Sequence, residues 1–87
     1  MVRRRSRVVI IMQILEYLSN GCSRPTKIAI ALNLAYDRLD NMLNQLKDAG
    51  LVEFNNDEYC ITRRGLRLLD EYRRFRDLAK SFGIEID

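Results

Sequence analysis

The chain has 87 residues, of which 47% are hydrophobic and 31% are charged, and its formal net charge is +3. This length allows one domain with a modest core and leaves no room for a second. The composition is too apolar for a disordered chain and too charged for a membrane span, so we expect a folded, soluble protein.

Two helices are predicted in the first third of the chain. Residues 7–18 carry an apolar side chain at every third or fourth position: Val8, Ile11, Met12, Leu15 and Leu18. Asn20 and Gly21 supply a natural stop after this helix. Pro25 suits the first turn of a second helix, because its missing N–H would have no partner there. This helix should end at Leu32, where Asn33 can adopt the left-handed conformation.

A third helix and a hairpin follow. The helix is predicted from Tyr36 to Asp48, with Gly50 just past its end. Its buried side consists of Leu39, Met42, Leu43 and Leu46. Residues 51–54 and 59–62 are β-prone, and Asn55-Asn56-Asp57 between them suits the positive φ angles of a hairpin loop.

A last helix is predicted from Arg63 to Ser81, capped by Thr62. At about 1.5 Å per residue it reaches nearly 30 Å, more than so small a domain can cover. Spacings of three and four residues mark a coiled-coil seam along it: Gly65, Leu68, Tyr72, Phe75, Ala79 and Phe82. Leu66 and Leu69 can face the domain's own core. The seam predicts a homodimer, although a helix that folds back on its own domain would show a similar pattern.

The order of three helices, a hairpin and a helix defines a winged helix-turn-helix domain, a mainly α fold with a small β-hairpin (α+β). We expect a basic flexible arm at 1–6, the winged helix-turn-helix domain at 7–62, an amphipathic dimerisation helix at 63–82 and a tail at 83–87. Residues that are moderately specific for one family occur throughout this domain: Ile14-Leu15-Glu16, Lys27-Ile28, 33–39, Leu43, Gly50-Leu51-Val52, Tyr59, Ile61-Thr62 and 65–72. In these positions the chain resembles an archaeal winged-helix family that includes small chromatin-associated proteins.

The resemblance implies a dimer that binds double-stranded DNA. In that family the last helices pair as an antiparallel coiled coil, the third helix enters a major groove and the hairpin, or wing, meets the flanking backbone. Members commonly have serine where this chain has Ala35, and lysines where it has Asp37 and Asn41. Two favourable charges are therefore absent here. The resemblance thus implies a transcriptional regulator or a chromatin-associated protein, located in the cytoplasm and bound to the nucleoid.

The polar side of the third helix carries the expected contacts to bases, because Asn and Gln can pair with adenine and Arg with guanine. The candidates are Tyr36, Arg38, Asn41, Asn44 and Gln45. Phosphate contacts are expected from Arg3, Arg4 and Arg5 in the arm, and from Arg24 and Lys27 where the second helix begins. A solvated helix face and an untethered tail are the plainer interpretations of these residues.

Charge is distributed unevenly, which supports a polyanionic partner and also raises an objection. Residues 1–27 net +5 and residues 63–76 net +4. The third helix nets -1, however, and the wing carries only acidic charges: Glu53, Asp57 and Glu58. A protein-interaction module without DNA binding is therefore the alternative function.

The apolar run at residues 8–12, after an arginine-rich start, also resembles a secretory signal. A signal needs roughly seven to fifteen consecutive apolar residues, so this run is too short to be one.

The chain offers little for catalysis or metal binding. It has no histidine, and Cys22 and Cys60 lack a CxxC spacing, so no metal and no cofactor are expected. It contains neither a glycine-rich phosphate loop nor a nucleophile beside a base, so we do not expect an enzyme. The two cysteines are interpreted as small buried side chains, with a disulfide as the alternative.

Overall fold

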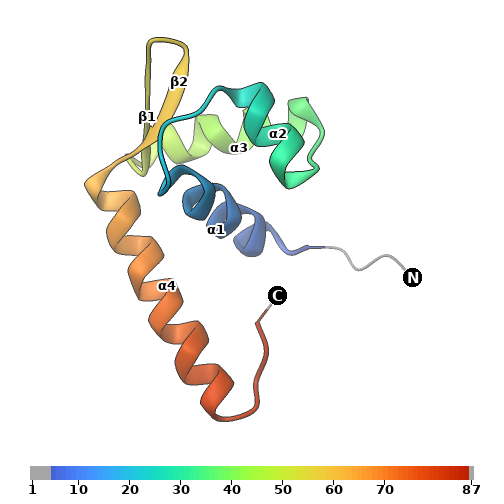
Figure 1. Ribbon diagram of the computed structural model, residues 1–87, viewed down its shortest axis with the longest axis vertical. Helices are drawn as coiled ribbons and strands as arrows, with labels where there is room; N and C mark the ends of the chain where they lie inside the picture. The colour runs from blue at the N-terminus through green and yellow to red at the C-terminus, as the bar shows by residue number, and fades with distance from the viewer. Residues whose placement is uncertain (1–4, 87) are drawn as a thin grey trace.

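The computed structural model describes residues 5–86, and within that range it contains four helices and two strands (Figure 1). In chain order these are α1 (Arg7–Leu18), α2 (Pro25–Leu32), α3 (Tyr36–Asp48), β1 (Val52–Asn55), β2 (Glu58–Ile61) and α4 (Arg63–Ser81). α1 lies in the middle, α2 and α3 lie on one side of it, and α4 runs away from the hairpin along the other side. The predicted fold class, a winged helix-turn-helix, is confirmed, and so are the predicted helix bounds.

Local signals fix the ends of these elements. The Ser6 hydroxyl accepts a hydrogen bond from the Val9 N–H at 3.2 Å, and Thr62 accepts one from the Gly65 N–H at 3.1 Å. Asn33 ends α2 with a φ of 54°. The hairpin turns through two residues of positive φ, Asn56 and Asp57, as the favoured two-residue loop requires. The strands pair antiparallel from Val52 with Ile61 to Asn55 with Glu58.

The core forms around α1, which is buried on more sides than its periodicity indicates. Ile10 and Ile14 are almost completely buried, whereas Val8, predicted on the buried face, is 56% exposed. The reason is that α1 packs against α2, β2 and α4 together, so apolar side chains on several of its faces are covered. None of the helices within the described range is both long and apolar enough to cross a membrane.

Gly65 is a packing residue of α4. The sequence pattern assigned it to a dimer seam, but it is buried where α4 meets the hairpin. A Cβ atom there would overlap the Leu51 carbonyl oxygen and would lie 2.7 Å from Cγ1 of Ile61. The start of α4 can therefore approach the hairpin this closely only because residue 65 has no side chain.

Cys22 and Cys60 form a disulfide, so the preferred interpretation of two separate buried thiols is wrong. Ser23 and Tyr59 exchange two backbone hydrogen bonds, of 2.9 and 2.8 Å, which pairs the segment before α2 with β2. In an antiparallel ladder the neighbouring pair is not hydrogen-bonded, and its Cα atoms lie closer together. Cys22 and Cys60 occupy that pair, with Cα atoms 4.3 Å apart. Backbone pairing between segments distant in sequence brings the two thiols together.

Candidate nucleic-acid interface

The exposed side of α3 gathers most of the predicted base-contacting residues. Leu39, Leu43 and Leu46 anchor the opposite side in the core, each at most 3% exposed. Four predicted side chains are exposed on the outer side: Arg38, Asn41, Asn44 and Gln45. Asp37 and Asp48 are exposed on the same helix. This surface therefore combines hydrogen-bonding amides and a guanidinium with two carboxylates.

Tyr36, the fifth predicted residue, belongs to the flank of α3 that faces the wing. Burial raises the pKa of the Tyr59 phenol in β2, and the Asp40 carboxylate and Tyr36 raise it further. Both α3 residues are thus near this strand. Phe54 of β1 stacks on Tyr59 with ring centroids 4.8 Å apart. The wing side of α3 is consequently aromatic and acidic.

The start of α2 presents the two cations predicted there. Arg24 is the N-cap residue of α2 and Lys27 lies in its first turn; both are exposed. The Ser23–Tyr59 backbone pair holds this end of α2 beside the wing. The arrangement offers two positive side chains and a helix N-terminus to one face of the molecule, which suits an anion.

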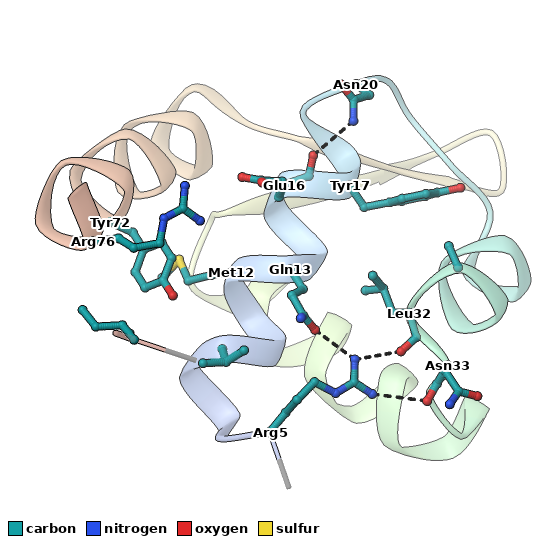
Figure 2. A pocket seen from close by; sticks show the side chains of 13 residues that line it. Arg5, Met12, Gln13, Glu16, Tyr17, Asn20, Leu32, Asn33, Tyr72 and Arg76 are labelled. Atoms are coloured by element: carbon teal, nitrogen blue, oxygen red, sulfur yellow. Dashed lines mark hydrogen bonds between the residues drawn. The ribbon is translucent and has the colours of Figure 1, made fainter. Parts of the chain in front are cut away.

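The predicted arm differs from expectation at its last residues. Arg3 and Arg4 lie outside the described residues. The Arg5 guanidinium donates hydrogen bonds to Gln13 Oε1 at 2.9 Å, to the Leu32 carbonyl at 2.8 Å and to the Asn33 carbonyl at 3.3 Å (Figure 2). It therefore caps the C-terminal end of α2 and lines a hollow of about 530 Å³ between α1, α2 and α4. Arg5 serves the fold in this position and is not part of a free arm.

Arg7 is a residue that the sequence reasoning did not single out. It is exposed at the first position of α1 and lines a hollow of about 510 Å³ together with five residues of α3: Arg38, Asn41, Met42, Asn44 and Gln45. A helical projection of α3 alone could not reveal it, because Arg7 belongs to another element. The basic block at residues 1–27 was the available signal.

The predicted dimer seam on α4 is divided between two faces. Leu68, Phe75 and Phe82 are exposed, Phe75 by 62% and Phe82 by 75%. Tyr72 instead packs against the domain's own core, and Ala79 is buried. Leu78, which the pattern omitted, is 60% exposed and joins the outer stripe, whereas Leu69 is buried and Leu66 is 42% exposed rather than in the core. The exposed stripe therefore consists of Leu68, Phe75, Leu78 and Phe82.

Polar contacts fix how α4 lies against α1. Arg73 donates two hydrogen bonds to Oε2 of Glu16, at 3.1 and 2.9 Å. This ion pair links α4 to α1. The Arg76 guanidinium lies 5.8 Å from the centre of the Tyr72 ring. The Arg76–Tyr72 contact lies within α4, so the Arg73–Glu16 ion pair and the buried side chains of α4 hold one side of this helix on its own domain, and the apolar stripe on the other side is uncovered in the monomer.

Comparisons with known proteins agree with this architecture. A family model described as winged helix-turn-helix matches residues 4–80. The structure of Lactococcus lactis ZitR is similar with a TM-score of 0.70 at 17% identity, over 94% of this chain and 60% of that chain. A MarR family protein from Bacillus stearothermophilus gives a TM-score of 0.71 at 21% identity, over 88% of this chain and 60% of that one.

A third similar structure is a hypothetical protein from Sulfolobus solfataricus, with a TM-score of 0.68 at 23% identity over 85% of this chain and 64% of that chain. The chain thus spans about three fifths of the length of these structures. At such identities the likeness shows a shared fold. A comparison with curated proteins finds no significant match.

Proposed function

Because the chain belongs to the winged helix-turn-helix family, we propose that it binds double-stranded DNA and regulates transcription. The observation that carries this proposal is the outer side of α3, where Asn41, Asn44 and Gln45 stand exposed. Amide side chains of this kind form paired hydrogen bonds with adenine in a major groove. The similar fold of a structure described as a MarR family transcription regulator supports the same function.

Affinity for the DNA backbone comes from the cations around α3 and not from the wing. Arg24 and Lys27 meet phosphates beside the wing, where Glu53, Asp57 and Glu58 contribute no favourable charge. Arg3 and Arg4 of the basic arm expected at residues 1–6 are proposed to supply further positive charge. If each subunit of a dimer neutralises three or four phosphates, log affinity should fall against log salt with a slope of about -5 to -7.

The test is a titration of a fluorescent duplex, followed by anisotropy at several salt concentrations. Lys27→Ala should make the slope less steep by about 2 for a dimer, because each subunit loses one phosphate contact. Lys80→Ala removes the same charge from the last turn of α4 and serves as the matched control. Absence of duplex binding by the full chain below physiological ionic strength would refute the proposed function.

The apolar stripe on α4 is proposed to pair two copies of the chain as an antiparallel coiled coil. Its four large side chains repeat at seven, three and four residues, which is the spacing of a coiled-coil seam. Four such side chains along one helix form a patch that a soluble monomer rarely leaves uncovered. Residues 63–82 are thus the proposed dimerisation segment, and the exposed side chains proposed to form its contacts are Leu68, Phe75, Leu78 and Phe82.

Light scattering tests the dimer. The chain mass is 10.3 kDa, and the measured mass should be twice this value. Phe75→Asp should return it to that of one chain, because a carboxylate would be buried in the seam. Ile30→Asp places the same charge on an apolar side chain of α2 that is 81% exposed, and it should leave the dimer intact. A monomer at micromolar concentration would exclude the seam.

Regulation of particular genes and packaging of chromatin are two forms of this function. The family that the sequence resembles includes chromatin-associated members, and α3 combines candidate base readers with a net charge of -1. We favour a regulator, because the amides on α3 suit base recognition better than indiscriminate phosphate binding. A genome-wide map of bound sites tests this: sharp peaks support a regulator, and even coverage supports packaging.

A protein-interaction module is the second candidate, and the acidic wing favours it. The hairpin has three carboxylates and no basic side chain, so it would repel a DNA backbone. The winged-helix fold does not by itself determine what a domain does. Failure of duplex binding in the anisotropy titration, with a dimer intact by light scattering, would support this candidate.

A further inference from the structure

The two flanks of α3 have opposite character, and one of them is completed by α1. On the wing flank, Tyr36 and Asp40 lie near Tyr59 of β2. On the other flank, Arg7 of α1 shares a hollow of about 510 Å³ with Arg38 and Gln45. In helical projection Arg38 and Gln45 lie on the side of α3 away from Tyr36 and Asp40. Arg7 and the wing therefore lie on opposite flanks of α3.

Charge separates these flanks further. The wing side contains Asp40, Lys47 and the three carboxylates of the hairpin, with Arg24 and Lys27 at the start of α2 beside it. The hollow brings two guanidinium groups to the other edge. Arg7 is exposed, and the first turn of α1 contains no acidic residue to neutralise it. Arg5 nearby is engaged by Gln13 and the end of α2, so of these two described arginines it is Arg7 that lines the hollow beside α3.

A major groove is about 12 Å wide and is bounded by two phosphate backbones. A helix that enters it brings each of its flanks close to one backbone. The flank toward the wing combines carboxylates with Lys47 of α3, whereas the flank toward α1 has two arginines and three amides around a hollow. Guanidinium groups bind phosphate oxygens with paired hydrogen bonds.

We propose that Arg7, together with Arg38, binds a backbone phosphate at the edge of the groove away from the wing, so that the start of α1 is part of the DNA interface. This inference rests on the proposed DNA binding and adds to it the residue that anchors the second backbone. Because Arg7 projects from α1 beside α3 and contacts no base in this arrangement, it contributes affinity and not sequence preference.

The experiment compares Arg7→Ala, Arg7→Lys and the full wild-type chain in the anisotropy titration over salt, with two duplexes of different sequence. Arg7→Ala should make the slope of log affinity against log salt less steep by about 2 for a dimer, and it should weaken both duplexes by the same factor. Arg7→Lys keeps the charge and should keep most of the slope. Arg74→Ala, an exposed arginine of α4 paired with Glu71, is the matched control and should change neither quantity.

The outcomes separate this inference from the proposed function. If the wild-type chain binds and Arg7→Ala binds with the same slope and affinity, Arg7 does not contact phosphate and the inference is wrong while DNA binding stands. A change in the ranking of the two duplexes without a change in slope would mean a base contact, which also overturns the inference. If the wild-type chain does not bind, the proposed function fails. Circular dichroism of Arg7→Lys and Arg7→Ala checks that both remain folded.

Discussion

Reduction of the Cys22–Cys60 disulfide should lower the stability of the domain by an amount that its place in the chain determines. The bond joins residues separated by 38 positions, and the loop it closes contains α2, α3, β1 and most of β2. In the chain-entropy relation, a closed loop of this length stabilises the folded state by about 4 kcal/mol at 25 °C, and measured values are commonly about 2–4 kcal/mol. The bond therefore contributes a large part of the stability of so small a domain.

Thermal unfolding followed by circular dichroism measures this contribution. A domain of this size shifts its melting temperature by about 4–8 °C per kcal/mol, so reductant should lower it by about 10–30 °C. The double variant Cys22→Ala/Cys60→Ala should melt near the reduced wild-type temperature and should not respond to reductant. Alkylation of the native protein without reductant counts its free thiols, and we expect none from this pair.

Two results would refute the reasoning. Two alkylated thiols in the native, unreduced protein would mean that the bond does not form. A melting temperature that is the same with and without reductant, in protein shown to be bridged, would mean that loop closure does not govern the stability. In that case the backbone pair between Ser23 and Tyr59 would already hold the wing to the segment before α2.

Three further predictions concern single residues. Gly65→Ala should destabilise the domain by about 1–3 kcal/mol in urea unfolding, because the added Cβ meets the Leu51 backbone. Helix propensity alone predicts a stabilisation of about 1 kcal/mol, so a stabilised variant would contradict the packing argument. Ala35→Ser should stabilise α3 by about 1 kcal/mol in the same assay, because Ala35 is an N-cap without a side-chain hydrogen bond; an unchanged midpoint would show that the hydroxyl does not reach the helix. Burial, with a smaller effect of Asp40, raises the pKa of Tyr59 above 10.0, so folding favours the neutral phenol. The stabilising contribution of the neutral Tyr59 phenol should be complete below about pH 10 and should fall as pH rises through the higher folded-state pKa. The variant Tyr59→Phe should therefore lose less stability than the wild type over that pH range.

Local features of the chain were enough to predict its elements. The four helices have the predicted bounds because their stops and caps act within a few residues: Ser6, Asn33 and Thr62 work through their own side chains or φ angles. The hairpin strands differ from prediction by one residue at each end. Leu51 is excluded from β1 because its N–H bonds to the Leu46 carbonyl at the end of α3, and Thr62 is excluded from β2 because it caps α4.

The roles of individual side chains depended on neighbours that the sequence does not display. Periodicity indicates that a helix has an apolar side, but α1 and α4 each have apolar residues on more than one side. Which of these are covered depends on the elements packed around them, so Ile10 and not Val8 is buried, and Tyr72 and Ala79 turn inward while Leu78 remains exposed.

The same distinction applies to the candidate interface. The polar residues of α3 could be predicted from its sequence, since they share one side of a single helix whose other side is apolar. The binding of Arg5 at the end of α2, the position of Arg7 beside Arg38 and the pairing of Cys22 with Cys60 each join segments far apart in the chain. Short-range preferences determined the helices and turns of this protein, whereas its cross-element contacts were decided only when those elements packed together, because packing sets which distant side chains meet.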